Sequence, residues 1–342
     1  MTQPETTKRR SDLTGPPDGL VDPGIVAAQA DLGGGAATPS VRIPAGAGDG
    51  LPGAPRSTRI GDRVFAWGTR TFVMGILNVT PDSFSGDGLL GAADPVAAAA
   101  VQARAMVEEG ADLLDVGGES TRPGHATVSI DDEIARVVPV IRAVRAEAPG
   151  VPISIDTTKP AVAEAALDAG AVLLNDIWGV AADDALLRVA AERRAPIVLM
   201  HNRAEARYRN LVAEVIADLQ RAIDRALDAG IAWDDLLVDP GFGFGKSPEQ
   251  NLAIVRELDR LRVLGRPILL GTSRKSTLGK ILDLGPDERL EATLATTALG
   301  VAAGADLVRV HDVRANVRVA RTADAIIRAV PGPARAEGSG GR

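Results

Sequence analysis

The sequence predicts an α/β protein: a TIM (β/α)8 barrel with a short N-terminal hairpin and a disordered N-terminal tail. Short apolar runs that end in polar residues alternate with Ala/Leu/Arg-rich stretches of helical spacing, and the chain repeats this unit eight times. Continuous runs of Val, Ile and Leu are typical of parallel strands that are covered on both faces. With 342 residues, of which 45% are hydrophobic, the chain is long enough for one large barrel plus an appendage.

Composition divides the chain into three segments. Residues 1–57 are dense in Pro, Gly, Ala and Asp and have too few large apolar side chains to offset the entropy of ordering them, so we expect a disordered tail. The folded domain is predicted at 58–332, and it begins with the alternating stretch RVFAWGTRTF, which indicates a hairpin at one end of the barrel. A second disordered tail is predicted at 333–342.

The strands and helices follow from the same repeating pattern. Strands are predicted at 72–79, 111–118, 151–157, 172–177, 195–201, 236–241, 266–273 and 306–312. Helices are predicted at 95–109, 131–147, 160–169, 183–194, 210–229, 249–264, 287–303 and 313–329. Several helices end in Gly-Ala just before a strand, as in EEGADLL and DAGAVLL, where glycine supplies a left-handed turn.

Two competing interpretations are weaker. A doubly wound sheet normally carries a G-x-G-x-x-G fingerprint after its first strand, whereas the corresponding turn here reads NVTPDSFSGDG. The stretch DPGFGFGKS at 239–247 looks like the end of a phosphate-binding P-loop, but Pro240 stands where that motif needs its first glycine. Proline has no N–H to offer a phosphate, so we reject the P-loop.

Charge and composition exclude several classes of function. The net charge is −7 with a pI near 5.2 and scattered basic residues, so we expect no nucleic-acid partner. The absence of cysteine excludes disulfides, thiolate metal sites and a cysteine nucleophile, and it agrees with a reducing compartment. No run of 18 apolar residues and no apolar signal segment occurs, so we predict a cytoplasmic protein without membrane contact.

In a TIM barrel the functional side chains gather at the carboxyl ends of the strands. Almost every predicted strand here ends in a hydrogen-bonding or charged residue. A single Asp or Asn at such a position is more often a helix N-cap, and it is the number of them that favours a functional site. These residues are Asn78, Asp115, Asp156, Asn175, His201, Asp239, Ser273, Arg274, Lys275, Arg309 and His311.

Eight stretches carry a resemblance to a known family. They are VMGILNVTPDSFSGDG (73–88), GADLLDVGGESTRPG (110–124), SIDTTKP (154–160), LNDIWG (174–179), VLMH (198–201), DPGFGFGKS (239–247), GTSRKS (271–276) and RVHDV (309–313). In this order they resemble the dihydropteroate synthase family, pterin-binding TIM-barrel enzymes of folate biosynthesis. The resemblance extends from about residue 60 to 330, so the N-terminal tail lies outside it.

The resemblance implies condensation of p-aminobenzoate with (7,8-dihydropterin-6-yl)methyl diphosphate, which gives dihydropteroate and pyrophosphate. It also implies a Mg²⁺ cofactor, a homodimer, and inhibition by sulfonamides. Asp239 would accept two parallel donors of the pterin, because a carboxylate matches an amino group beside a ring N–H. A mere turn cap before Pro240 is the alternative for Asp239.

The remaining roles are also carried over from the resemblance. Arg309 and His311 would bind the diphosphate, Asn78 would help to hold Mg²⁺, and Lys275 would hydrogen-bond the pterin. The predicted catalytic residues are Asp82, Thr121, Arg122, Lys275, Arg309 and His311, and the predicted metal ligand is Asn78. The predicted substrate-binding residues are Asp156, Asn175 and Asp239 for the pterin, and Phe84, Phe244 and Ser276 for p-aminobenzoate.

Several positions stay open at this point. His201 is either a site residue or a structural histidine, and we expect His125 to lie in solvent. Phe242 is expected in the core and Lys246 to be a solvated loop charge. Two departures from the family pattern are the loop SFSGDG, which shifts an aspartate to Asp87, and the short stretch NRAEARYRN at 202–210.

Two rival functions remain. A methyltetrahydrofolate:corrinoid methyltransferase would share the Asp/Asn pterin edge, but it has no use for a diphosphate site or for the STRPG and SRKS motifs. A catalytically silent paralogue would bind a pterin or a partner without turnover. The intact polar positions argue against it.

Overall fold

The computed structural model describes residues 57–79, 94–119, 127–178 and 184–328. A hairpin comes first, formed by β1 (Ser57–Ile60) and β2 (Arg63–Ala66). Eight further strands follow: β3 (Phe72–Asn78), β4 (Leu113–Gly117), β5 (Ile153–Asp156), β6 (Leu173–Asp176), β7 (Ile197–Met200), β8 (Leu236–Asp239), β9 (Leu269–Leu270) and β10 (Leu307–Val310). Each lies inside a strand predicted from the sequence and is shorter than it.

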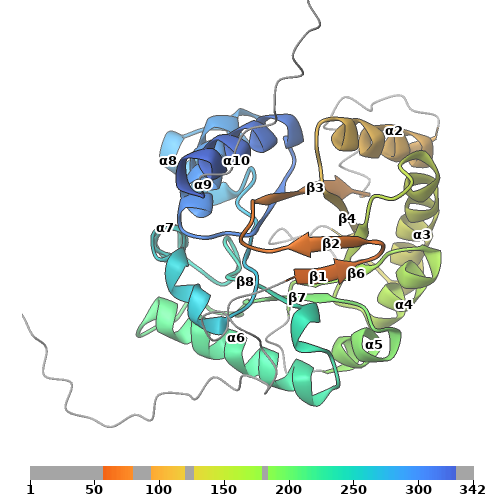
Figure 1. Cartoon of the computed structure of the whole chain (residues 1–342), viewed down its shortest axis with the longest axis horizontal. Coiled ribbons are helices and arrows are strands. Elements are labelled where there is room, and N and C mark those ends of the chain that lie inside the picture. The colour runs from red at the N-terminus through yellow and green to blue at the C-terminus, as the bar shows by residue number, and fades with distance from the viewer. Residues whose placement is uncertain (1–56, 80–93, 120–126, 179–183, 329–342) are drawn as a thin grey trace, which may run out of the picture. The chain divides into compact units, whose positions relative to one another are not determined.

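The eight strands form one parallel sheet in the order β8-β7-β6-β5-β4-β3-β10-β9. A bridge between Val238 and Ile268, with a 3.0 Å bond from Val238 N–H to the Pro267 carbonyl, joins the two ends of this sheet. The sheet is therefore closed into a barrel. Figure 1 shows the barrel viewed along its axis, with the helices arranged around the outside. This confirms the predicted fold class for the described residues. The predicted terminal tails lie outside the described residues, apart from Ser57 at the start of the hairpin.

Helices connect the strands in the predicted order. They are α2 (Pro95–Glu108), α3 (Ile130–Glu147), α4 (Pro160–Ala169), α5 (Ala185–Arg193), α6 (Leu211–Asp228), α7 (Pro248–Arg256), α8 (Ser276–Leu282), α9 (Leu290–Ala302) and α10 (Val313–Ile327). Short 3₁₀ helices are η1 (Trp233–Asp235), η2 (Leu258–Leu264) and η3 (Pro286–Glu288). At the end of α4, Gly170 adopts φ 118° and its N–H bonds the Ala166 carbonyl, as the Gly-Ala pattern predicts.

Two differences from the predicted helices have a physical reason. The helix predicted at 249–264 divides into α7 and η2. Leu258, Leu261 and Leu264 recur every third residue, and a 3₁₀ helix, with three residues per turn, places all three on one buried face. Helix α8 was not predicted, because its seven residues are too few to show a helical period in the sequence.

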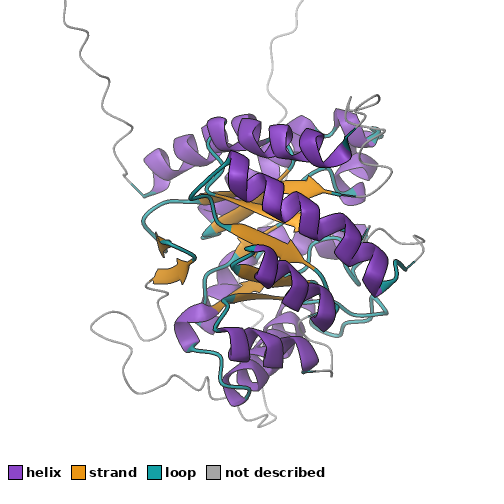
Figure 2. Cartoon of the chain, turned by 90° about the vertical axis from the view of Figure 1, so that its right-hand side faces the viewer, coloured by secondary structure: helices purple, strands orange, loops and turns teal. Residues whose placement is uncertain are grey.

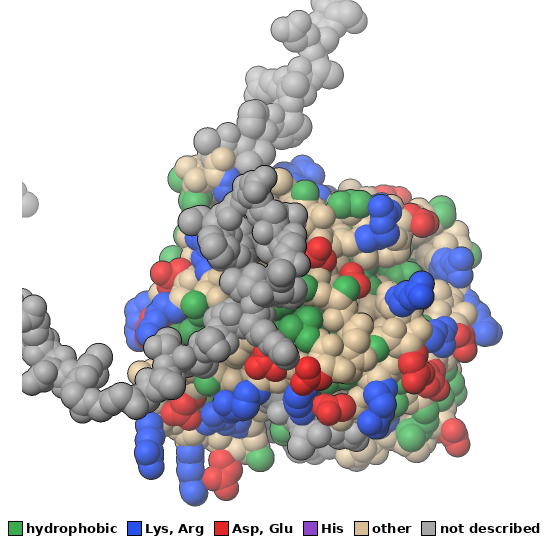
Figure 3. All heavy atoms as spheres, turned by 60° about the horizontal axis from the view of Figure 1, so that its bottom comes forward, with side chains coloured by type: hydrophobic (Ala, Val, Ile, Leu, Met, Phe, Trp, Pro, Cys, Tyr) green, Lys and Arg blue, Asp and Glu red, His purple; other side chains and the backbone are tan. Residues whose placement is uncertain are grey.

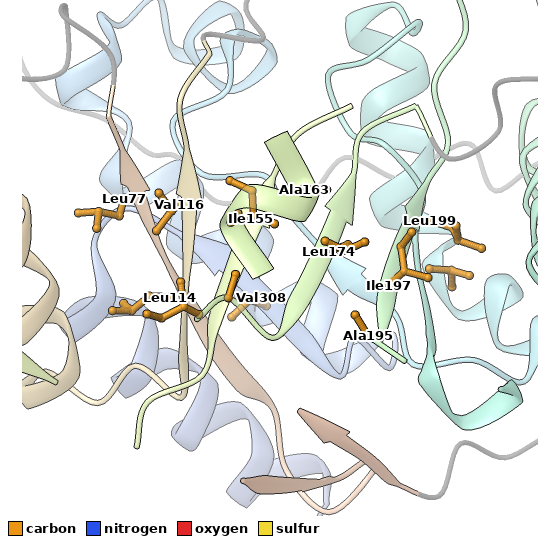
Figure 4. Packing of buried hydrophobic residues seen from close by; sticks show 14 of the residues in the cluster. Leu77, Leu114, Val116, Ile155, Ala163, Leu174, Ala195, Ile197, Leu199 and Val308 are labelled. Carbon is orange, nitrogen blue, oxygen red and sulfur yellow. The ribbon is translucent and has the colours of Figure 1, made fainter. Parts of the chain in front are cut away.

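Side chains alternate between the two faces of the barrel strands. The outward side chains, among them Leu114, Ile155, Leu174, Ile197 and Val308, belong to one buried cluster that also contains helix residues such as Ala163. Figure 4 shows these side chains between the sheet and the surrounding helices. This layer explains why the strands read as continuous apolar runs.

The inward side chains at the amino ends of the strands form a second buried cluster with the hairpin. Ile60, Phe65 and Trp67 pack there against Phe72, and the first inward residues of the strands complete the cluster: Met74, Leu113, Leu173, Val198, Leu237, Leu269 and Leu307. Figures 1 and 2 show the hairpin lying across this end of the barrel. The predicted hairpin therefore closes the amino end.

The surface of the described residues is mixed in charge. On the face drawn in Figure 3, Lys and Arg side chains are interspersed with Asp and Glu side chains. Among the described residues, no helix combines the length and apolarity needed to cross a bilayer.

Candidate active site

Polar residues occupy the inward positions two residues beyond the apolar amino-end layer. Since side chains on one face of a strand recur every second residue, an inward leucine places the residue two positions later on the same face. The pairs are Leu113 and Asp115, Leu173 and Asn175, Leu237 and Asp239, and Leu307 and Arg309. The strand register sets Asn175 beside Asp156 as well. The carboxyl half of the barrel interior is therefore lined with hydrogen-bonding groups.

Arg309 lies at the centre of these groups. Its Nε donates to Asp115 Oδ2 at 2.6 Å, and its Nη2 donates to Asp156 Oδ2 at 2.7 Å. Asn175 Nδ2 donates to the same Asp115 oxygen at 3.0 Å. The residues come from β4, β5, β6 and β10, so the pattern ties four strands together. Asp115 is 0% exposed, and its charge is compensated by the buried guanidinium.

Two carboxylate oxygens in this network accept no hydrogen bond within the described part of the chain. They are Asp115 Oδ1 and Asp156 Oδ1, both buried. Burial raises the pKa of Asp156 to about 7, although the Arg309 guanidinium acts in the opposite direction. A buried acceptor without a partner is costly, and such groups are typical of sites that a ligand completes.

A cavity lies beside this network, at the carboxyl end of the barrel. It is lined by Asp156, Asn175, Ile177, Met200, Asp239, Phe242, Phe244, Gly271, Lys275 and Arg309. Asp239 Oδ1 accepts the Gly241 N–H at 2.6 Å, and burial raises the pKa of Asp239 to about 6. Apolar walls with a few convergent polar groups suit a flat heterocycle that carries several donors and acceptors.

Lys275 and Phe244 meet at the rim of this cavity. The Lys275 ammonium lies 4.1 Å from the centroid of the Phe244 ring. Ser276 follows as the exposed first residue of α8. The turn that carries Lys275 is strained, since Arg274 has φ +54°, and it is held by two hydrogen bonds from Arg274 to Asp312 at 2.7 and 3.1 Å.

His311 comes after β10 and points to the same end of the barrel. Ser273 Oγ accepts the backbone N–H of His311 at 3.1 Å and lies 3.0 Å from its Nδ1. A hydroxyl that already accepts one bond has its proton available for Nδ1, which places the imidazole proton on Nε2. Burial lowers the pKa of His311 to about 3. His311 is therefore a neutral hydrogen-bond donor and not a cation at neutral pH.

Asn78 ends β3 on the same side of the barrel. Its Oδ1 and Asp156 Oδ2 each lie 3.8 Å from where a Cβ on Gly117 would stand, so both face the space above that glycine. Among the described residues, no group of three or more His, Cys, Asp and Glu side chains is arranged to hold a metal ion. A metal at Asn78 would take most of its ligands from substrate and water, a mode that suits Mg²⁺.

Comparison with known proteins decides the family. Residues 74–311 match the model described as pterin binding enzyme. The chain is 49% identical to the dihydropteroate synthase of Clostridium beijerinckii over 271 residues, covering 79% of this chain and 99% of that protein. It is also 49% identical to the dihydropteroate synthase of Bacillus subtilis over 258 residues, covering 75% and 89%. The chain belongs to the dihydropteroate synthase family.

Solved structures of the family share the fold. Dihydropteroate synthase from Xanthomonas albilineans in complex with 7,8-dihydropteroate is 41% identical, with a TM-score of 0.73 over 80% of this chain and 100% of that chain. The same enzyme with 4-aminobenzoic acid is 43% identical, with a TM-score of 0.75 over 81% and 100%. The family assignment makes this chain a transferase and confirms the resemblance drawn from its motifs.

The site residues predicted for this dihydropteroate synthase family member fall into three groups. The structure brings Asp156, Asn175, Asp239, Phe244, Lys275 and Arg309 to one cavity. It places Asn78, Ser276 and His311 at the same end of the barrel, outside the lining of that cavity. The predicted residues Asp82, Phe84, Thr121 and Arg122 lie outside the described residues, as do Asp87 and His125.

Three individual expectations are settled by burial and register. Phe242 is 1% exposed, which confirms it as a core residue. His201 follows the inward Met200, so it lies on the outer face of the barrel, where it contacts Asp218 of α6 at 3.0 Å. Lys246 was expected to be a solvated loop charge, and this was wrong, because its ammonium is partly buried and hydrogen-bonds two backbone carbonyls and His201.

Sequence reasoning left two parts of the site without a role. Asp115 was noted only as a polar strand end, yet it joins Arg309 to Asn175. Ser273 was noted in the same way, yet it bonds His311. The signal that would have found Asp115 is its position two residues after an inward leucine, whereas no sequence pattern pairs Ser273 with a residue 38 positions away.

Proposed function

We propose that this chain condenses p-aminobenzoate with (7,8-dihydropterin-6-yl)methyl diphosphate to give 7,8-dihydropteroate and pyrophosphate. The observation that carries the proposal is the cavity in which Asp239, Asn175 and Asp156 converge beside the apolar side chains of Ile177, Met200 and Phe244. The relatives from Xanthomonas albilineans, solved with 4-aminobenzoic acid and with 7,8-dihydropteroate, support this substrate class.

The pterin is assigned to the deep part of the cavity. A pterin presents an amino group beside a ring N–H, and the Asp239 carboxylate accepts both when it is ionised. Asp156 Oδ1, which accepts no hydrogen bond within the described residues, and the amide of Asn175 supply further acceptors and donors from the cavity lining. Lys275 faces the same space from the rim. Every polar edge of the heterocycle then finds a partner, which a buried ligand needs.

The diphosphate is assigned to the end of the barrel near β3 and β10. Arg309 uses one N–H on Asp115 and one on Asp156, and a guanidinium has five, so it retains donors for phosphate oxygens while it stays paired. His311 adds an Nε2–H donor. The placement agrees with TIM barrels in general, in which phosphate groups often lie near the loops after strands seven and eight.

We propose that Mg²⁺ accompanies the diphosphate and that Asn78 supplies one amide oxygen to it. The fit rests on the oxygen donor set near Gly117, to which Asp156 also belongs. When bound, the ion would neutralise charge that develops on the leaving pyrophosphate. The chain's own residues do the rest: they orient the pterin methylene carbon and hold the phosphate oxygens.

The reaction needs little base catalysis. The carbon–oxygen bond of the methylene group breaks with its electron pair going to pyrophosphate, and the electron-rich dihydropterin shares the positive charge left on carbon. The amine of p-aminobenzoate then forms the new carbon–nitrogen bond and loses its proton to solvent. Donors at Arg309 and His311 stabilise the leaving charge, which is the largest expected contribution.

The p-aminobenzoate subsite is assigned to the rim, next to the pterin carbon. Phe244 offers an apolar ring face and Ser276 a hydroxyl; the Lys275 ammonium lies 4.1 Å from the centroid of that ring, and Ser276 is the next residue in the chain. Asp82, Phe84, Thr121 and Arg122, which lie outside the described residues, are proposed to complete this subsite and the diphosphate site.

Three further properties are proposed for this chain: its oligomeric state, its location in the cell and its sensitivity to inhibitors. We infer a homodimer, a cytoplasmic location and sensitivity to sulfonamides, which compete with p-aminobenzoate by shape and charge. A dihydropteroate synthase from Yersinia pestis, 38% identical, has been solved in a complex with a sulfonamide drug. The corresponding test on this chain is competition between a sulfonamide and p-aminobenzoate in the assay below.

A pyrophosphate-release assay with both substrates tests the proposed reaction. We expect release only when the pterin diphosphate and p-aminobenzoate are both present, with dihydropteroate formed in equal amount. Binding of both substrates without release would indicate a silent paralogue. Methyl transfer from methyltetrahydrofolate without condensation would instead favour the corrinoid methyltransferase type.

A further inference from the structure

The loop DPGFGFGKS wraps around a partly buried lysine. Lys246 Nζ lies 3.0 Å from the Gly241 carbonyl, 3.0 Å from the Phe244 carbonyl and 2.9 Å from His201 Nδ1. An ammonium group has three N–H donors, and here each one has an acceptor. The glycine-rich loop therefore surrounds a cation with its carbonyls, the reverse of a P-loop, in which N–H groups surround an anion.

The acceptor role of Nδ1 fixes the state of His201. If Nδ1 accepts from Lys246, the ring proton is on Nε2, which lies 3.0 Å from Asp218 Oδ2 and donates to it. The same Asp218 oxygen accepts from Arg203 Nε at 2.8 Å. Burial, followed by the Lys246 charge, lowers the pKa of His201 to about 4, so the imidazole is neutral at physiological pH.

The loop is pressed onto the chain that follows β7. A Cβ on Gly241 would stand 1.8 Å from the His201 carbonyl oxygen, and one on Gly245 would stand 2.3 Å from the Arg203 carbonyl oxygen. Tyr208 adds a further contact, from its hydroxyl to the Gly245 carbonyl at 2.8 Å. The glycines permit the approach, and Lys246 connects the loop to the outer face of the barrel.

Asp239, at the start of this loop, and Phe244, further along it, line the proposed pterin cavity. Asp239 is bonded to the Gly241 N–H at 2.6 Å, and Phe244 stacks on Lys275. Lys246 donates hydrogen bonds to the carbonyls of Gly241 and Phe244. Its own side chain does not line the cavity. We propose that Lys246, held by neutral His201, is a positioning residue that sets Asp239 and Phe244 in the geometry for pterin binding.

A matched pair of His201 substitutions tests this role. In His201→Asn the amide replaces Nδ1 and keeps an acceptor for Lys246, whereas in His201→Gln the amide replaces Nε2 and keeps only the link to Asp218. Affinity for the pterin diphosphate substrate is measured by calorimetry without p-aminobenzoate, at about pH 6.5. We expect His201→Gln to weaken binding about tenfold, the scale of one lost hydrogen bond, and His201→Asn to weaken it much less.

Lys246→Met tests the lysine itself, because methionine keeps the length of the side chain and removes all three donors. We expect at least a tenfold loss of affinity for the pterin diphosphate, with pyrophosphate affinity within about twofold of the wild type. Lys280→Met, on the exposed side of α8, is the control. If Lys246→Met does not fold, Tyr208→Phe removes another contact to the same loop and should weaken pterin binding in the same selective way.

The outcomes separate this inference from the proposed function on which it rests. Wild-type protein that binds no pterin diphosphate would contradict the function. Wild-type protein that binds it, together with unchanged binding in His201→Gln and Lys246→Met, would overturn the positioning role. Equal losses of pterin and pyrophosphate affinity would also overturn it, since they would indicate general destabilisation of the barrel.

Discussion

The two ends of the barrel are built on opposite principles. At the amino end, the hairpin packs Phe65, Trp67 and Phe72 into one aromatic group, with Phe65 and Phe72 at 4.8 Å between centroids. The polar atoms there are matched within the chain, as in the 2.9 Å bond from Trp67 Nε1 to Thr58 Oγ1. At the carboxyl end, one carboxylate oxygen of Asp115 and one of Asp156 are buried and accept no hydrogen bond within the described residues.

The difference shows how one strand pattern serves both stability and function. Each barrel strand alternates its side chains, so the first inward residue meets the hairpin and the next inward residue meets the cavity. The amino end is packed closed within the chain, whereas the carboxyl end keeps a cavity that the ligand would fill in the proposed function. Substitutions at the two ends should therefore change different measured quantities.

The largest expected effect is at the amino end. Phe65→Ala removes a ring that is 2% exposed, and we expect the free energy of unfolding to fall by about 3–5 kcal/mol. Pterin affinity of the folded protein should stay within about twofold, because the ring packs at the end of the barrel opposite the cavity. Chemical denaturation and calorimetry measure the two quantities. Val64→Ala, 55% exposed on the same hairpin, is the control and should change stability by less than about 0.5 kcal/mol. A large loss of pterin affinity in Phe65→Ala would break the separation of the ends.

Arg309→Ala should be the exception to that separation, because it leaves the buried carboxylates of Asp115 and Asp156 unpaired. We expect a loss of about 3 kcal/mol in stability, and of about 1.5–3 kcal/mol in pyrophosphate affinity. Adding Asp115→Asn to this variant should recover part of the stability and none of the affinity. Denaturation and pyrophosphate calorimetry measure both. Unchanged pyrophosphate binding would show that Arg309 is a structural partner only.

Asp239→Asn should affect binding and spare the fold. The amide keeps the size of the side chain but turns a donor toward the donors of the pterin, so affinity should fall by about 1.5–3 kcal/mol. Burial raises the folded-state pKa of Asp239, so its stability contribution is present below the unfolded pKa and is lost as pH rises through about 6. Above that pH the variant should be as stable as the wild type or more stable. Calorimetry showing wild-type pterin affinity would remove Asp239 from the site.

The same pKa predicts how binding depends on pH. In the proposed site the ionised Asp239 carboxylate accepts the pterin donors, and below about pH 6 that group is protonated in the free protein. Affinity should therefore fall as pH decreases, approaching tenfold per pH unit for a single proton that must leave. Asp239→Asn should bind weakly and lack this part of the pH dependence. A parallel slope in both proteins would assign the titration to another group.

Most of the fold was predictable from the sequence, for a reason that the structure makes plain. Leu114, Ile155 and Val308 are outward and buried while their inward neighbours are buried too, so each strand reads as an unbroken apolar run. Helix α8 was missed because seven residues show no period. The division between α7 and η2 was missed because residues spaced by three fit both helix types.

The site residues that stand at strand ends could be predicted from the sequence. Those that depend on contacts between distant segments could not. Asp156, Asn175, Asp239 and Arg309 stand at strand ends, and the structure brings them together. Lys246 was misjudged because a lysine in a glycine-rich loop looks solvated, and only the tertiary contact with His201 shows otherwise. Such pairs depend on how elements pack, which local pattern does not encode.

The smallest expected effect concerns Ser273. Its hydroxyl lies at the carboxyl end of the barrel, yet its hydrogen bonds are made within the chain, to His311. Ser273→Ala removes the bond to His311 Nδ1, so the imidazole proton is no longer held on Nε2. One neutral hydrogen bond is worth about 0.5–1.5 kcal/mol, so kcat and pyrophosphate affinity should fall roughly two- to tenfold. Thermal stability and pterin affinity should hardly change, because Asp239 and its cavity are not touched. Ser276→Ala, three residues further, is the matched control and should raise the KM for p-aminobenzoate while leaving pyrophosphate affinity intact. If both serine variants shift the same kinetic constant, Ser273 does not act through His311.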